Sequence, residues 1–181
     1  MAFVRTRTRG DLISTALVEA YRNERGQPRQ RLLANLHGEP DLLSALAKLA
    51  ARRDDLRKEQ DALAADAVAA NQFYEIVTLN TLHGKQYSSE ERKEIDALMK
   101  QRGHLLARMA KIEADLAVIQ KDGVAIKKHC SATPEQIQDA IKAFKQKRHD
   151  AETLALGLEY GLRTNLKEAK ATFRRLQSIR A

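Results

Sequence analysis

The amino-acid sequence predicts a mainly α-helical protein in which long antiparallel coiled-coil helices, as a helical hairpin or a three-helix bundle, follow a small N-terminal antiparallel β meander. Apolar residues alternate before Leu36, whereas from Pro40 onwards they recur every seven positions. Aromatic residues make up only 4% of the chain and tryptophan is absent, which is typical of long helices. We therefore expect a basic β meander over residues 1–38 and a long-helix region over 39–181.

Three stretches of the first region alternate as strands do, namely Phe3–Arg9, Thr15–Arg22 and Arg29–Asn35. Gly26 and Pro28 separate the last two and indicate a hairpin loop. Because such a small sheet is not stable alone, its apolar residues should pack on a helix or on a second copy of the chain. These residues are Val4, Leu17, Tyr21, Leu33 and Leu36.

The seven-residue pattern predicts helices over residues 40–79, 89–129 and 134–179. Pro40 suits a first helical turn, and the motifs Ser88–Glu91 and Thr133–Gln136 are typical of capping boxes. The first predicted seam contains Leu42, Leu49, Leu56, Leu63, Ala70 and Val77, with Leu46, Arg53, Gln60, Ala67 and Tyr74 four residues later. The second contains Leu98, Leu105, Ile112, Ile119 and Ile126, with Ile95, Arg102, Met109 and Leu116.

Polar residues interrupt both seams. Arg53, Gln60 and Arg102 would be costly in a dry core, so we expect them to set the register or oligomeric state, or to lie where the seam is half covered. The spacing of Gly157 and Gly161 in the third helix favours either close helix approach or a local kink.

Positive charge gathers at the two ends of the chain, whose formal net charge is +8. Residues 1–36 contain seven arginines, no lysine and three carboxylates. Guanidinium groups on alternate residues of a strand lie about 6.6 Å apart and can each meet a phosphate, and a two-stranded ribbon can enter the DNA major groove. The candidate nucleic-acid-binding residues are Arg5, Arg7, Arg9, Arg22, Arg25, Arg29 and Arg31. The alternative is a solvated edge strand protected by charge.

A second basic set lies near the C-terminus, where it could follow a phosphate backbone or simply form a soluble outer face. It contains Lys142, Lys145, Lys147, Arg148, Arg163, Lys167, Lys170, Arg174, Arg175 and Arg180.

No residue pattern predicts catalysis, a metal or a cofactor. The five histidines lack ligand spacing and should lie on the surface or at helix ends. Cys130 has no orienting acid nearby in sequence, so we expect no catalytic thiol. One cysteine, no apolar run long enough for a membrane helix and no signal-peptide pattern predict a cytoplasmic protein of a bacterial or otherwise reducing interior.

The segment 20–38 resembles the N-terminal hairpin of insertion-sequence transposases of the DDE class. In that family a strand and a polar turn with Gly precede Arg-Gln-Arg, two apolar residues, Ala-Asn-Leu and Gly, which here are Arg29, Gln30, Arg31, Ala34, Asn35, Leu36 and Gly38. The resemblance implies an origin near mobile DNA and a hairpin used for DNA contact or nucleoprotein assembly. The sequence contains no catalytic domain of that family, so we carry over no transposase activity.

Together these observations favour a non-catalytic DNA-associated accessory or architectural protein. Its basic hairpin would contact the phosphate backbone of double-stranded DNA, and its helices would mediate assembly, for example as a homodimer. The alternative is a coiled-coil scaffold or adaptor whose arginines bind an acidic protein partner.

Overall fold

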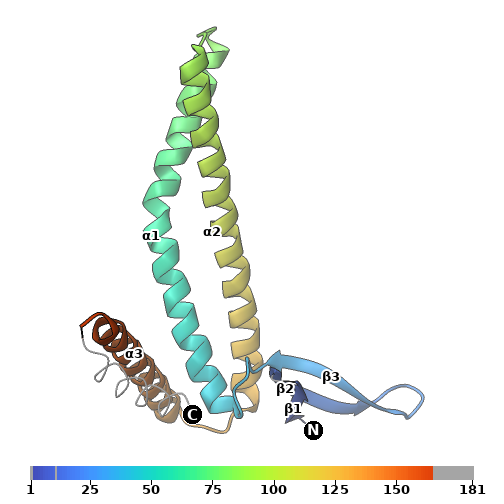
Figure 1. Cartoon of the computed structure of the whole chain (residues 1–181). Coiled ribbons are helices and arrows are strands. Elements are labelled where there is room, and N and C mark those ends of the chain that lie inside the picture. Colours follow the sequence, from blue (N-terminus) through green and yellow to red (C-terminus); the bar gives the residue numbers. More distant parts are fainter. Residues whose placement is uncertain (1, 11, 165–181) are drawn as a thin grey trace. The chain divides into compact units, whose positions relative to one another are not determined.

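The computed structural model describes residues 2–10 and 12–164 (Figure 1). Three strands, β1 (Ala2–Arg9), β2 (Leu12–Arg22) and β3 (Pro28–Asn35), precede three helices. The helices are α1 (Leu42–Leu82), α2 (Ser89–His129) and α3 (Pro134–Thr164). This architecture confirms the predicted fold class. The chain divides into two compact units, a first of residues 1–51 with 122–181 and a second of residues 52–121.

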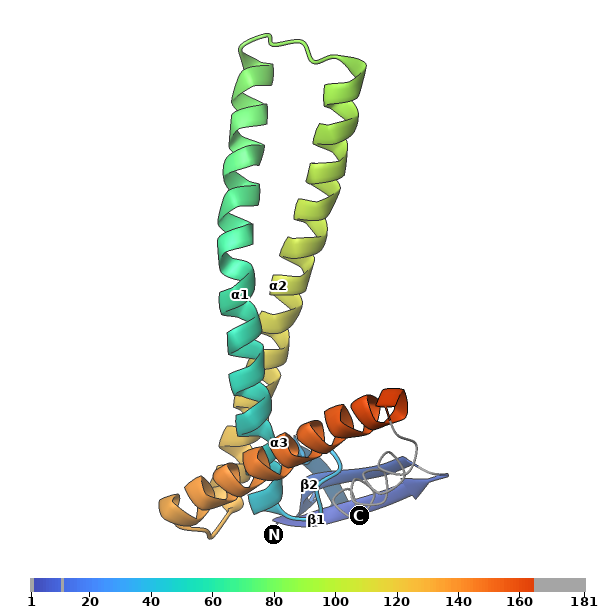
Figure 2. The ribbon, with the colours of Figure 1, turned by 60° about the vertical axis from the view of Figure 1, so that its left-hand side comes forward.

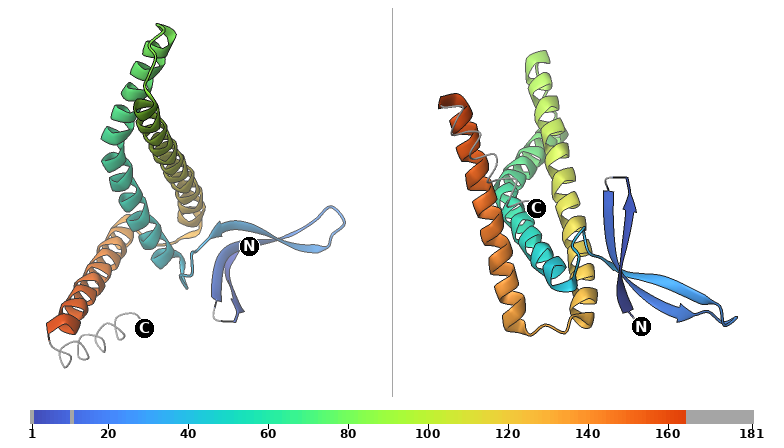
Figure 3. Two further views of the ribbon diagram at one scale, coloured as in Figure 1. Left: turned by 45° about the horizontal axis from the view of Figure 1, so that its top comes forward. Right: turned by 60° about the horizontal axis from the view of Figure 1, so that its bottom comes forward.

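The sheet of the first unit is antiparallel, with β2 in the centre. β1 pairs with the first part of β2, ending at the pair Ala2–Glu19, whereas β3 pairs with residues 16–22. The three strands therefore overlap over only a few residues, and each end of the sheet is a two-stranded ribbon (Figure 3). Pro28 opens β3, a position that proline tolerates because its missing N–H breaks no inner ladder bond.

A β-bulge lies in the centre of the sheet. Leu17 pairs with Ala34 and Val18 pairs with Leu32, so that Leu33 has no partner across the ladder. The extra residue lets Leu17 and Ala34 share one face while Val18 and Leu32 share the other. Both Leu17 and Val18 are 1% exposed, so the centre of the sheet is covered on both faces.

The expected cover of the sheet is found in part. Leu17 and Leu36 are buried together with Leu49 of α1 and Ile126 of α2, which form the core of the first unit. Tyr21, in contrast, is 45% exposed, so the prediction that it packs against a helix or a second copy is wrong within this chain. The reason is its position beyond the end of β1, where only β2 and β3 continue.

The second unit is a helical hairpin, in which α1 and α2 run antiparallel (Figure 2). Ion pairs join them at both of two levels, with Arg108 Nε 2.7 Å from Glu59 Oε1 and Arg52 Nη2 3.5 Å from Asp115 Oδ2. Nearly all predicted seam residues are buried or half-buried, and the exposed exceptions are Arg53, Tyr74 and Leu98. Arg53 turns to its neighbour Asp54, with Nη2 3.0 Å from Oδ1, instead of entering the seam.

Both predicted capping boxes form. The Ser88 N–H donates to Glu91 Oε2 at 2.7 Å and the Glu91 N–H to Ser88 Oγ at 3.2 Å, and Thr133 and Gln136 exchange the same bonds at 2.9 and 3.3 Å. These bonds satisfy N–H groups that have no partner inside the helix. They also lower the pKa of the Glu91 carboxyl, chiefly through the Ser88 backbone N–H.

Two other helix ends differ from the prediction. α1 starts at Leu42 and not at Pro40, because Asp41 caps it by accepting the Ser44 N–H at 2.9 Å. It also ends later, at Leu82, in a Schellman motif: Lys85 N donates to Asn80 O and Gly84 N to Thr81 O, both at 3.0 Å. Gly84 has φ +78°, the left-handed conformation that this motif requires.

α3 continues as one helix through Gly157 and Gly161 to Thr164, so a break at the glycines is absent from this part of the chain. The predicted end at residue 179 lies outside the described residues. No helix over residues 2–10 and 12–164 combines the length and the apolar character needed to cross a membrane.

Candidate nucleic-acid interface

The strand register places three candidate arginines on one face of the sheet. Arg5, Arg7 and Arg9 pair with Ala16, Ser14 and Leu12 of β2, and alternate residues of a strand point to the same side. Arg22 lies on this face too, because Val18, Ala20 and Arg22 continue the same alternation. We call this side the arginine face.

The remaining candidates lie elsewhere on the ribbon. Arg29 pairs with Tyr21 and Arg31 with Glu19, on the face opposite to the arginine face. Arg25 belongs to the turn between β2 and β3. The seven candidates therefore surround the β2–β3 ribbon instead of forming one flat patch, and a ligand would contact subsets of them.

The turn that carries Arg25 is closed by its own hydrogen bonds. Asn23 Oδ1 accepts the Arg25 and Gln27 N–H groups at 3.1 and 2.9 Å, and the Gly26 N–H donates to Asn23 O at 2.8 Å. Gly26, with φ +72°, permits this tight course. Arg22 Nη1 donates to Gly26 O at 2.8 Å, which fixes one arginine beside the turn.

Only one candidate arginine is neutralised by a carboxylate among the described residues. Arg31 Nε donates to Glu19 Oε2 at 2.7 Å, and this bond lowers the pKa of the Glu19 carboxyl. Arg5 donates to Gln30 Oε1 at 2.8 Å and Arg29 to Gln27 Oε1 at 3.4 Å, both neutral acceptors. The side chains of Arg7, Arg9 and Arg25 are exposed and have no partner in the part of the chain that the structure describes.

A turn after β3 connects the sheet to α1. His37 adopts φ +53°, uncommon for a residue other than glycine, and its N–H donates to Asn35 Oδ1 at 2.8 Å. Its Nε2 lies 3.3 Å from Oδ2 of Asp122, which is only 8% exposed. Lys48 Nζ donates to His37 O at 2.8 Å and to Glu39 Oε1 at 2.9 Å. The sequence interpretation of His37 as a plain surface residue missed this role, because Asp122 lies far away in the sequence.

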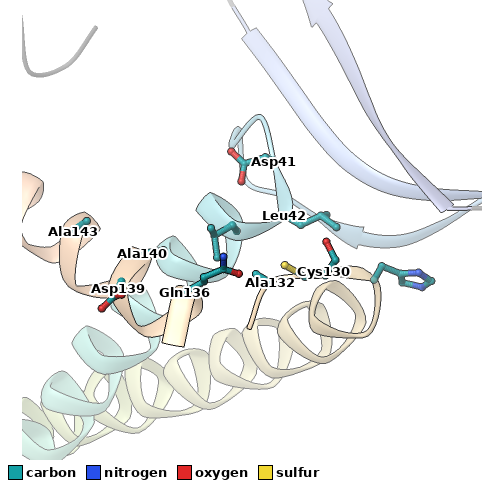
Figure 4. A pocket seen from close by; sticks show the side chains of 11 residues that line it. Asp41, Leu42, Cys130, Ala132, Gln136, Asp139, Ala140 and Ala143 are labelled. Carbon is teal, nitrogen blue, oxygen red and sulfur yellow. The ribbon is translucent and has the colours of Figure 1, made fainter. Parts of the chain in front are cut away.

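A shallow hollow of about 840 Å³ in the first unit contains the lone cysteine. Cys130, after α2, is half-buried there between the start of α1, with Asp41 and Leu42, and the first turns of α3, with Asp139 and Ala140 (Figure 4). None of the described residues form a His, Cys, Asp and Glu group able to hold a metal ion. Within the same residues the hollow presents no hydrogen bond to the Cys130 thiol.

The basic residues of α3 are exposed where the structure describes them. Arg148 Nε bonds Glu152 Oε1 at 2.9 Å, and Lys142 Nζ lies 3.9 Å from Asp139 Oδ1, so part of this charge is balanced within the helix. The candidates from Lys167 to Arg180 lie outside the described residues, as does the side chain of Arg163.

The fold therefore defines a class of protein, a helical hairpin and a third helix attached to a small sheet rich in arginine. No family model, curated protein or solved structure matches the chain.

Proposed function

We propose that this protein is a non-catalytic, DNA-associated accessory or architectural factor of the cytoplasm. The sheet would contact the phosphate backbone, and the helices would mediate assembly. The observation that carries the proposal is the set of arginines that no carboxylate neutralises, above all Arg7, Arg9 and Arg25, which are exposed and without a partner in the described residues. Unpaired guanidinium groups are available to phosphate oxygens and release counterions on binding.

The geometry of the ribbons supports the same function. Each end of the sheet is two strands wide, the form in which β structure can enter the major groove of DNA. Arg7 and Arg9 lie on one face about 6.6 Å apart along β1. The resemblance of residues 20–38 to transposase hairpins favours DNA over other polyanions.

Duplex binding at several salt concentrations tests the proposal. We expect the triple variant Arg5→Ala, Arg7→Ala, Arg9→Ala to bind a DNA duplex at least about ten-fold more weakly than the wild type at low salt. Its salt dependence should fall by nearly one log unit per lost phosphate contact for each ten-fold change in salt.

A matched control removes three exposed charges from α2, as Lys93→Ala, Lys100→Ala, Lys111→Ala. This variant should bind almost as the wild type does if the sheet is the interface. Equal losses in both triple variants would show that net charge alone attracts the duplex. Wild-type protein that fails to bind at low salt would disprove the proposal.

A coiled-coil scaffold or adaptor is the second candidate, supported by an apolar stripe on the back of α1. Val68, Ile76, Leu79 and Leu82 are each more than half exposed. At about 100° per residue they fall within about 120° of one another and opposite to the seam. Such a stripe is typical of a surface that contacts another protein.

Two measurements separate the candidates. Purified protein that carries nucleic acid, removable by salt, supports DNA association. If the stripe binds a second copy, light scattering should detect a dimer that the variant Ile76→Lys, Leu79→Lys converts to a monomer. A monomeric wild-type protein without nucleic acid would favour an acidic protein partner for the arginines.

A further inference from the structure

A small hollow lies on the arginine face of the sheet. It measures about 170 Å³, and all three strands contribute polar side chains to its lining: Arg5 and Arg7 from β1, Ser14 from β2 and Asn35 from β3. The register explains this grouping, because Arg7 pairs with Ser14 while Arg5 and Asn35 both pair with Ala16. Residues paired across neighbouring strands share a face, so these four side chains converge.

One donor of this hollow is buried and has no acceptor. Arg5 Nη1 donates to Gln30 Oε1 at 2.8 Å, which holds the guanidinium across β2 and over the buried Val18. Arg5 Nε is buried without a hydrogen-bond partner. Buried N–H groups nearly always have a partner, so an orphaned guanidinium N–H indicates an acceptor that binds there. The Nε edge is also the edge through which arginine holds an oxyanion with two parallel bonds.

The charge and size of the hollow restrict its ligand. Two guanidinium groups line it and no carboxylate does. Glu19, the one carboxylate described on β2, lies on the opposite face with Arg31. A volume of about 170 Å³ is below the roughly 300 Å³ at which pockets for drug-sized ligands begin, so a nucleobase would not be enclosed. A single tetrahedral oxyanion group fits these properties.

We propose that this hollow binds one phosphate group of a nucleic-acid backbone. The Arg5 Nε edge takes two phosphate oxygens, Arg7 takes a third, and Ser14 and Asn35 supply neutral donors. The inference rests on the proposed function and deepens it, because one seated phosphate fixes the register of the sheet along the strand, whereas the outer arginines contribute only general attraction.

The Arg5 Nε–H group provides a direct readout in the full-length chain. Its nitrogen–proton NMR signal should shift saturably on titration with inorganic phosphate and should not shift with sodium chloride at the same ionic strength. The signal of Arg7 should follow, and that of Arg9, on the same face but outside the hollow, should move at least about five-fold less. Equal shifts of all three signals, or equal effects of chloride, would overturn the proposal.

Charge-matched variants extend the test to DNA. Arg7→Gln and Arg9→Gln each remove one exposed charge from β1. Arg7→Gln should weaken inorganic phosphate binding about ten-fold and Arg9→Gln less than about two-fold. Ser14→Ala, which leaves the charge unchanged, should weaken phosphate binding as well. The melting temperature of each variant shows whether its sheet still folds.

The two proposals fail in different ways. Saturable phosphate binding at Arg5 with no duplex binding would retain the phosphate site and reject DNA association. Duplex binding that falls equally in Arg7→Gln and Arg9→Gln, without a saturable phosphate shift, would retain DNA association and reject the site.

Discussion

The guanidinium of Arg102 on α2 lies 4.3 Å from the centroid of the Tyr74 ring on α1. The same side chain donates from Nε to Asn71 Oδ1 at 2.9 Å. A polar residue in the middle of an apolar seam thus has both a stacking surface and an acceptor on the facing helix. These contacts are available in only one register of the hairpin, so Arg102 supports the expectation that seam polar residues set the register.

Arg102→Ala should therefore lower the free energy of unfolding by about 1–3 kcal/mol, because half-buried Asn71 loses its partner. Arg102→Lys should recover little, since an ammonium group lacks the planar fork that stacks and donates together. The control is Arg53→Ala, another seam position by spacing but an exposed one, and it should cost less than about 0.5 kcal/mol. Urea unfolding measures all three. A cost for Arg53→Ala as large as that for Arg102→Ala would contradict this explanation.

The elements of the fold could be predicted because each is encoded locally. Alternation marks the strands, and the capping motifs mark the starts of α2 and α3. The start of α1 was misplaced because Pro40 and Asp41 both suit a helix start, and only the bond from Ser44 to Asp41 identifies the cap. Tyr21 was misplaced because alternation predicts a face, whereas burial depends on how far the neighbouring strand extends.

The candidate interface was predictable in composition but not in arrangement. The sequence contains seven arginines, yet which of them are neutralised depends on cross-strand pairs such as Arg31 with Glu19. The bond from Arg5 to Gln30 spans the whole sheet, and that between His37 and Asp122 joins distant segments. No spacing rule in a single sequence predicts such contacts, because they arise only when the strands and helices pack.

One substitution should have opposite effects at two glycines. Gly84→Ala should destabilise the hairpin by about 1 kcal/mol, because φ +78° is unfavourable for alanine. Gly103→Ala should stabilise it by about 0.5–1 kcal/mol, since Gly103 lies inside α2 and an added methyl group meets nothing within 4 Å. Thermal unfolding followed by circular dichroism measures both. The same sign at both positions would be incompatible with the Schellman end of α1.

Asp41 should make stability depend on pH. The Ser44 backbone N–H lowers the pKa of the Asp41 carboxyl from its usual 3.8. A lowered folded-state pKa means that the contribution is complete above the unfolded pKa and is lost as pH falls through the folded value. Asp41→Ala should therefore cost about 1 kcal/mol at neutral pH, and its difference from the wild type should shrink below pH 3.8.

Asp41→Asn is the control for this titration, because asparagine also caps helices but carries no titrating group. The difference in melting temperature between Asp41→Asn and Asp41→Ala should stay constant between about pH 7 and about pH 3. A difference between wild type and Asp41→Ala that does not change with pH would show that the carboxylate is not the capping species.

The contact between His37 and Asp122 should hold the turn after β3, and a double-mutant cycle tests it. His37→Gly relieves the left-handed backbone at φ +53° but leaves the buried Asp122 carboxylate without its imidazole partner. We expect the lost partner to dominate, so that His37→Gly lowers the free energy of unfolding by about 1–3 kcal/mol. Asp122→Ala should make the second substitution much less costly, with a coupling of about 0.5–3 kcal/mol. Additive losses in the double variant, measured by urea unfolding, would mean that the two side chains stabilise the protein independently and that the turn is held by Lys48 instead.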